Sequence, residues 1–134
     1  MELNKLFGTW KLVHNNNFQS FLKFVGCNWL IRKAAKHATI YIDIQGEGEY
    51  YSKKIRSSFY RTKEKIYLDN IFRKDKFMKR RYKRVGDSII CNVQTRSRHW
   101  MEKSYLHGEQ IIIELSWNDD TNNTHMCTQK YNRI

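Results

Sequence analysis

The sequence predicts an all-β fold, a sandwich or a barrel, with a pair of short helices near its start. After residue 38, apolar and polar residues alternate with the two-residue period of a strand. Turn signals such as Gly46-Glu47-Gly48 and Gly86-Asp87 separate these short runs at regular spacing. Between residues 18 and 37, by contrast, apolar residues recur at helical spacing. These three observations together define the expected fold class.

The chain begins with a predicted strand over residues 7–13, in which Trp10 and Leu12 face one side. We expect Trp10 to lie in the core, and Gly8 to allow another backbone to approach closely. A helix follows over residues 18–25, and any of the three asparagines at 15–17 could cap it. A second helix is predicted over residues 28–37.

The rest of the chain is predicted to form strands joined by turns. Residues 39–45 provide the clearest case, because three isoleucines alternate there with polar or aromatic residues. Residues 118–123 form a polar loop before the last strand. No repeat or linker interrupts the pattern, so residues 1–134 are predicted to form a single domain. The predicted strands after the helices are residues 39–45, 49–57, 60–68, 70–74, 77–85, 88–95, 98–106, 110–117 and 124–133.

Composition limits the classes of protein to consider. A domain of 134 residues can bury a core without metal or disulfide staples. Because no signal peptide or membrane-spanning run is evident, Cys27, Cys91 and Cys127 are interpreted as reduced thiols of a cytoplasmic protein, which could also enter the nucleus. The formal net charge of +12 favours an acidic partner, either an anionic membrane or a polyanion.

Nothing in the sequence indicates catalysis. The five histidines lie on different segments, and none has the spacing of metal ligands. The chain has no nucleophile elbow, phosphate loop or dinucleotide fingerprint. We therefore expect a protein that is not an enzyme and that uses no cofactor or metal.

Seven short motifs run from the first predicted strand to the last. They are Gly8-x-Trp10-x-Leu12, Asn17-Phe18, Phe21-Leu22, Ile31-Arg32-Lys33-x-Ala35, Phe59-x-x-Thr62, Gly86-Asp87 and Gln129-x-Tyr131. Together they resemble the intracellular lipid-binding proteins, which include the fatty-acid-binding and cellular retinoid-binding proteins. The resemblance implies a ten-stranded antiparallel up-and-down β-barrel, or β-clam, with a helix-turn-helix lid after the first strand. A barrel of about ten strands is too wide for its own side chains to fill, so it can enclose a ligand.

The resemblance also identifies residues for the ligand's head group. Fatty-acid binders have Arg-x-Tyr where this chain has Gln129 and Tyr131, and both side chains reach the cavity. An arginine holds a carboxylate by charge-assisted hydrogen bonds, whereas glutamine is a neutral donor and acceptor that suits a hydroxyl, aldehyde or amide. The same replacement occurs in the retinol-binding branch, so it points away from a plain fatty-acid clamp.

Two further head-group positions remain open between neighbouring residues. A second family arginine matches Ser104 or, with the alignment gap moved, Lys103. In the basic stretch of residues 77–84, either Arg80 or Arg81 should face the interior and could hold a carboxylate or phosphate. A one-residue slip reverses which side chains face inward, so the sequence leaves both choices open.

The remaining candidates would contact the ligand's tail or a membrane. A basic helical surface beside the cavity entrance could dock on anionic lipid head groups. The docking candidates are Lys23, Arg32, Lys33 and Lys36. The tail and portal candidates are Phe18, Leu22, Cys27, Ile42, Phe59, Ile66 and Leu68.

The favoured function is an intracellular carrier, a monomer that binds a long-chain fatty acid or similar lipid and transports it, with transient membrane contact. A carrier of retinoid or another neutral-headed lipid is the main alternative. A basic nucleic-acid-binding β-barrel is a weaker one, suggested by the charge and by aromatics among the basic residues 72–84, although we expect no stable nucleic-acid partner. An enzyme acting on a lipid is the least supported.

Overall fold

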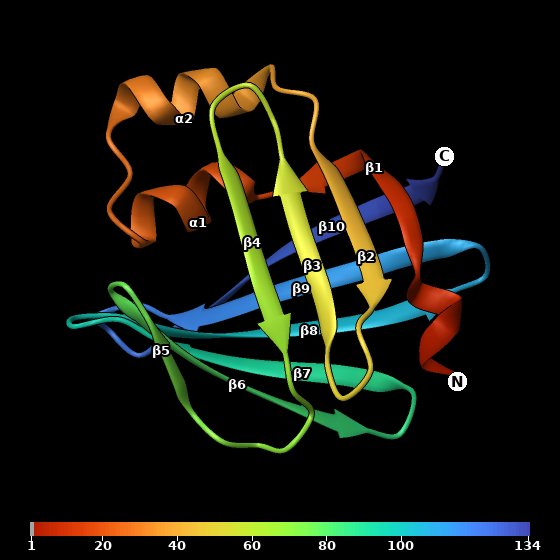
Figure 1. Cartoon of the computed structure of the whole chain (residues 1–134). Coiled ribbons are helices and arrows are strands. Elements are labelled where there is room, and N and C mark those ends of the chain that lie inside the picture. The colour runs from red at the N-terminus through yellow and green to blue at the C-terminus, as the bar shows by residue number, and fades with distance from the viewer. Residues whose placement is uncertain (1) are drawn as a thin grey trace.

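A computed structural model describes residues 2–134, and its ten strands form one antiparallel sheet that curls into a barrel (Figure 1). Strands that follow one another in the chain also pair with one another, except that β4 and β5 are not paired and form the two ends of the sheet. The strands are β1 (Gly8–Asn16), β2 (Tyr41–Gly46), β3 (Tyr51–Arg56), β4 (Arg61–Ile66), β5 (Arg73–Asp75), β6 (Met78–Val85), β7 (Ser88–Gln94), β8 (His99–His107), β9 (Gln110–Asn118) and β10 (Thr124–Arg133).

Two short helices lie between β1 and β2 and stand over one end of the barrel (Figure 1). They are α1 (Phe18–Phe24) and α2 (Trp29–Lys36), and a 3-10 turn (Leu3–Leu6) precedes β1. The predicted ten-stranded barrel with a helical lid after the first strand is therefore confirmed. Neither helix is long and apolar enough to cross a membrane, and residues 2–134 contain no other α-helix.

The first strand is longer than its apolar alternation predicts. Residues up to Asn16 pair with β10, after a register shift between Leu12 and His14. This long-range pairing, which a local pattern cannot reveal, extends β1 by three residues past Val13. Asn17 then starts α1 in a left-handed conformation and does not cap it with its side chain, which instead donates to the Met126 carbonyl at 3.0 Å. The prediction that an asparagine side chain caps this helix was wrong.

The core contains Trp10, as predicted. Its side chain is 1% exposed and its indole nitrogen donates to the Leu6 carbonyl at 2.9 Å. The Arg133 guanidinium lies 4.2 Å from the ring centroid of Trp10. Arg133 also explains why residue 8 is a glycine, because a Cβ at this position would lie only 2.6 Å from Nη1 of Arg133. The close approach predicted at this glycine therefore comes from a side chain and not from another backbone.

The long loop between β9 and β10 is organised by one carboxylate. Asp119 accepts hydrogen bonds from the Thr121 and Asn123 backbone amides, each at 2.9 Å, and from the Thr121 hydroxyl at 2.7 Å. Its other oxygen lies 2.8 Å from His125 Nε2. The hydrogen bond with His125, followed by that with Thr121, lowers the pKa of Asp119 well below its usual range.

Replacing this carboxylate should lower the melting temperature at pH 7, because Asp119→Asn removes the charged acceptor. A lowered pKa stabilises the fold above the unfolded-state value of about 4, and this stabilisation is lost as the pH falls through the folded-state pKa. In thermal unfolding experiments, the difference in melting temperature between wild type and Asp119→Asn should thus become smaller as the pH drops below about 4. Asp120→Asn is the control, since that side chain is 93% exposed. An equal effect of both changes would contradict the assignment.

Candidate functional site

A cavity of about 380 Å³ lies between the helices and the inner walls of the barrel. This volume falls within the range of about 300–1,000 Å³ common for small-molecule sites. A void of about 30 Å³ adjoins it and shares four lining residues, Ile42, Lys53, Glu102 and Ile113. The other residues that line the cavity are Phe18, Phe21, Leu22, Val25, Cys27, Ile31, Ile40, Ile55, Phe59, Tyr60, Thr62, Glu64, Met78, Arg80, Trp100, Leu115, Gln129 and Tyr131.

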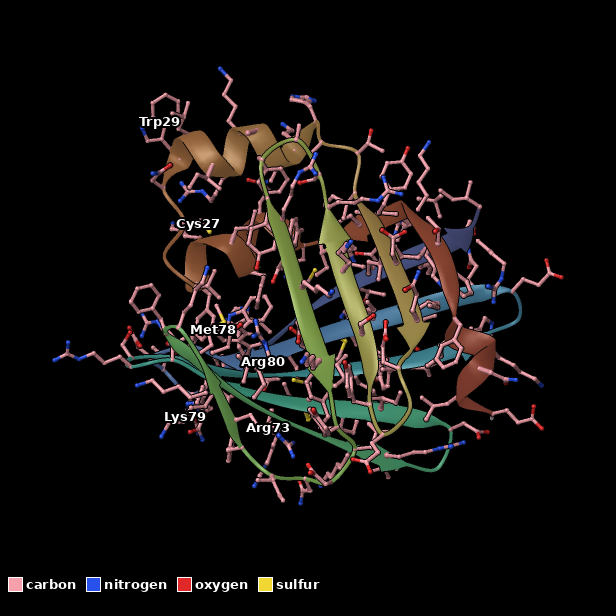
Figure 2. All side chains as sticks on the ribbon, viewed as in Figure 1. Cys27, Trp29, Arg73, Met78, Lys79 and Arg80 are labelled. Carbon is pink, nitrogen blue, oxygen red and sulfur yellow. The ribbon has the colours of Figure 1, made fainter. Side chains whose placement is uncertain are left out.

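The helical end of the cavity is apolar because α1 turns its buried face into the barrel. Phe21 packs edge-on against Trp100 and Trp117, with ring centroids 5.5 Å apart in each pair. Phe18 stacks on Phe21 at 6.3 Å. Figure 2 shows Cys27 in the link between the two helices. This end of the cavity offers hydrocarbon contacts and little else.

The structure brings most of the predicted tail residues together. Phe18, Leu22, Cys27, Ile42 and Phe59 all line the cavity. Two others do not. Ile66 reaches only the small adjoining void, and Leu68 is half-buried against the core just beyond β4 without lining either space.

Inside the barrel, an ion pair connects β4 with β6. The Arg80 guanidinium lies 3.7 Å from the Glu64 carboxylate, and both side chains are largely buried. The Tyr82 hydroxyl donates to the same carboxylate, and Arg80 also donates to the Met78 sulfur at 3.2 Å. Burial lowers the pKa of Arg80, but Glu64 and Tyr82 favour its charged form, so the pKa lies above its usual value.

A second polar group lies on β8 and β10. Gln129 and Tyr131 are both buried, and the Tyr131 hydroxyl donates to Gln129 Oε1 at 3.3 Å. Burial raises the pKa of Tyr131, and the negative charge of Glu102 raises it further. Glu102 accepts a long hydrogen bond of 3.4 Å from the Trp100 indole. A carboxylate therefore stands close to the tyrosine that the sequence singled out.

Strand alternation decides the two choices that the sequence left open. Arg80 lines the cavity, whereas Arg81 lies on the outer face with its guanidinium 4.7 Å from the Phe72 ring centroid. Ser104 lines the small void, whereas Lys103 lies on the opposite face of β8, 5.6 Å from the Tyr105 ring. Arg81 and Lys103 therefore cannot contact a ligand inside the barrel, since neighbouring side chains of a strand point to opposite faces.

Sequence reasoning missed three charged residues that line the cavity, Lys53, Glu64 and Glu102. Lys53 is 8% exposed and lies on β3, directly opposite Glu64 in the β3–β4 register. Among residues 2–134 it has no hydrogen bond or ion pair. A signal was present, because Lys53 stands midway between Tyr51 and Ile55, and alternate residues of a strand share a face.

The candidate docking residues lie on the two helices, Lys23 on α1 and the other three on α2. Lys23, Lys33 and Lys36 are exposed, whereas Arg32 is partly buried and donates to the Cys27 carbonyl at 2.8 Å. The first turn of α2 adds exposed apolar side chains, with Trp29 at 66% and Leu30 at 60% exposure. Figure 2 shows Trp29 pointing away from the barrel.

Within residues 2–134, no group of three or more His, Cys, Asp or Glu side chains is arranged to hold a metal ion. The cavity is apolar at its helical end and polar at depth. Its polar side chains belong to β3, β4, β6, β8 and β10.

Comparison with solved structures places the fold. The chain matches Caenorhabditis elegans lipid binding protein 8 with a TM-score of 0.89 at 18% identity, covering 100% of this chain and 99% of that one. It matches a structure described as REP1-NXSQ fatty acid transporter with a TM-score of 0.85 at 24% identity, covering 96% of both chains. At these identities, the likeness concerns the fold.

Comparison with curated proteins places the family, although no family model matches the chain. Fatty acid-binding protein homolog 5 of Caenorhabditis elegans is 30% identical over 122 residues, which are 86% of this chain and 90% of that protein. Fatty acid-binding protein 9 of Homo sapiens is 32% identical over 116 residues, 84% of this chain and 88% of that protein. The match to C. elegans homolog 7 spans about half of that protein, 51%. The chain belongs to the fatty-acid-binding protein family.

Proposed function

We propose that this protein is a carrier that encloses one long-chain fatty acid, or a similar lipid, in the cavity beneath its helices. The supporting observation is the shape of that cavity, about 380 Å³ with an apolar helical end and a polar deep end. An amphipathic molecule with a hydrocarbon tail and a small polar head matches this division. Curated relatives of this chain are named for binding fatty acids.

The tail and head would then contact different elements. The tail would lie against α1, the link to α2 and the turn between β3 and β4, and the head would face the polar strands. Ile66 would lie beyond the tail at the small adjoining void, and Leu68 would contribute only to the core. The residues assigned to the tail are Phe18, Leu22, Cys27, Ile42 and Phe59, and those assigned to the polar end are Arg80, Ser104, Gln129 and Tyr131.

A carrier of a neutral-headed lipid, such as a retinoid, is the second candidate. Gln129 supports it, because this buried amide can donate to or accept from a hydroxyl or carbonyl without requiring a charge. Both candidates bind and transport without catalysis. We expect the carrier to act as a monomer in the cytoplasm, with access to the nucleus.

A binding titration tests the carrier proposal. Purified, delipidated protein should bind a fluorescent fatty-acid analogue with micromolar or tighter affinity, and oleate should displace it. The affinity should change little between about 50 and 200 mM salt, because the contacts are enclosed, whereas a nucleic-acid-binding protein would lose affinity steeply over that range. Retinol is titrated in parallel to compare the two ligand classes. Failure of every lipid to bind would refute the carrier proposal.

We further propose that the carrier exchanges ligand while the helices touch an anionic membrane. The helices carry exposed Lys23, Lys33 and Lys36 together with exposed Trp29 and Leu30, which combines charge attraction with apolar side chains able to enter the interface. Each lysine near an anionic surface contributes about 1 kcal/mol. Arg32 contributes less in this picture, since its guanidinium is held by the Cys27 carbonyl.

Reversing two charges on α2 should slow ligand transfer. The double change Lys33→Glu with Lys36→Glu should reduce the rate at which fatty acid moves to vesicles containing phosphatidylserine, and should leave the rate to neutral vesicles unchanged. Stopped-flow fluorescence measures both rates. The charge-matched control is Lys11→Glu with Lys65→Glu, on the outer faces of β1 and β4, where both lysines are exposed. If the control slowed transfer equally, net charge and not the helical surface would govern docking.

A further inference from the structure

The row of side chains at Gln129 and Ser104 provides no cation for a carboxylate. Both residues are register partners of Ile113, one on β10 and the other on β8, so they occupy one row across three neighbouring strands. Gln129 is a neutral amide and Ser104 a neutral hydroxyl. A fatty-acid carboxylate placed along this row would have neutral hydrogen-bonding groups and no counter-charge.

The charge next to this row is negative. Glu102 is two residues before Ser104 on the inner face of β8, and it lines both the cavity and the small void. Besides burial, its charge raises the pKa values of Tyr131 and Cys91, so its field reaches β10 on one side and β7 on the other. A ligand carboxylate beside Tyr131 would therefore be repelled, because like charges in an enclosed site are poorly screened.

Two cations line the cavity, Lys53 and Arg80, and they differ in their surroundings. Arg80 already has the Glu64 carboxylate at 3.7 Å and the Met78 sulfur at 3.2 Å. Glu64 Oε2 also accepts from the Tyr82 hydroxyl, so this oxygen is directed toward β6. Lys53 lies opposite Glu64 in the strand register but is not ion-paired with it. The residue is 8% exposed, and its ammonium makes no hydrogen bond or ion pair within residues 2–134. The nitrogen keeps some accessible surface, since Arg81 Nε is the one fully enclosed side-chain N or O atom without a partner in that range.

An ammonium that lines the cavity without an ion-pair partner favours an anionic group on the ligand. Burying an unpaired charge is strongly unfavourable unless a partner of opposite charge satisfies it. Lys53 lines both the cavity and the small void, so a ligand head at the deep end of the cavity would meet it. A flexible lysine also suits a single carboxylate as a point charge, without the fixed fork of an arginine.

We propose that Lys53 on β3 is the anchor for the carboxylate of the bound fatty acid. This inference rests on the proposed carrier function and makes it more specific. The ligand's charge would lie against the β3 wall, where Lys53 would offset the negative charge of Glu102, which lines the same void, while Gln129 and Tyr131 would offer neutral groups. Lys53 then determines the preference for a fatty acid over an alcohol of the same chain length.

The test compares two neighbouring lysines and two ligands that differ only in their head group. Lys53→Met should weaken oleate binding by about 10- to 100-fold, as expected for loss of a hydrogen bond to a charged group. Oleyl alcohol, which carries no charge, should bind both proteins within a factor of about two. Lys54→Met is the matched control, because Lys54 is exposed on the same strand and points outward. Displacement of a neutral fluorescent probe measures all affinities.

Further variants keep the test decisive. Lys53→Arg should retain most of the oleate affinity because it keeps the charge, and Lys53→Gln should lose it if Lys53→Met does not fold. Unchanged oleate binding in Lys53→Gln, or an equal loss in Lys54→Met, would overturn the assignment. So would a loss of oleate binding in Arg80→Met while Lys53→Met binds normally. If the wild type bound neither oleate nor oleyl alcohol, the carrier proposal itself would fail instead.

Discussion

The pairing of β1 with β10 is the contact on which the rest of the structure depends. It joins the first strand of the chain to the last, from Trp10 opposite Arg133 to Asn16 opposite Thr128. Without it, the strands would form two separate meanders, and neither could enclose a space. Once the sheet curls, the two-residue period of every strand assigns each side chain to the inside or the outside. The contents of the cavity then follow from strand register.

Register also explains why the interior tolerates four charged side chains. The lining contains Lys53 and Arg80 together with Glu64 and Glu102, so the enclosed charges balance. An uncompensated charge would be costly in an enclosed space. The balance is uneven in space, because Arg80 and Glu64 lie within 4 Å of each other while Lys53 and Glu102 have no ion-pair partner among residues 2–134. Under the proposal for Lys53, selectivity for the ligand's head group would arise from this unevenness.

Most of the fold could be predicted from the sequence, because it depends on local patterns. The isoleucines at 40, 42 and 44 alternate clearly, and all three are buried. The residues of the site were harder to predict from the sequence, because their strands carry basic residues on both faces. Nothing in the local sequence shows whether Arg80 or Arg81 faces the interior. For Lys103 and Ser104, the inward residue becomes clear only from the pairing of Ser104 with Ile113. Lys53 follows Ser52 and precedes Lys54, so it reads as part of a solvated strand until the barrel closes around it.

The unpaired edges of β4 and β5 have a consequence of their own. Here the wall lacks a backbone ladder, and side chains from β4 and β6 span the interval through Glu64, Arg80 and Tyr82. Side chains rearrange far more quickly than a hydrogen-bonded sheet opens. A change in the Glu64–Arg80 contact could thus alter this side of the wall without breaking any strand pairing or displacing α1 or α2.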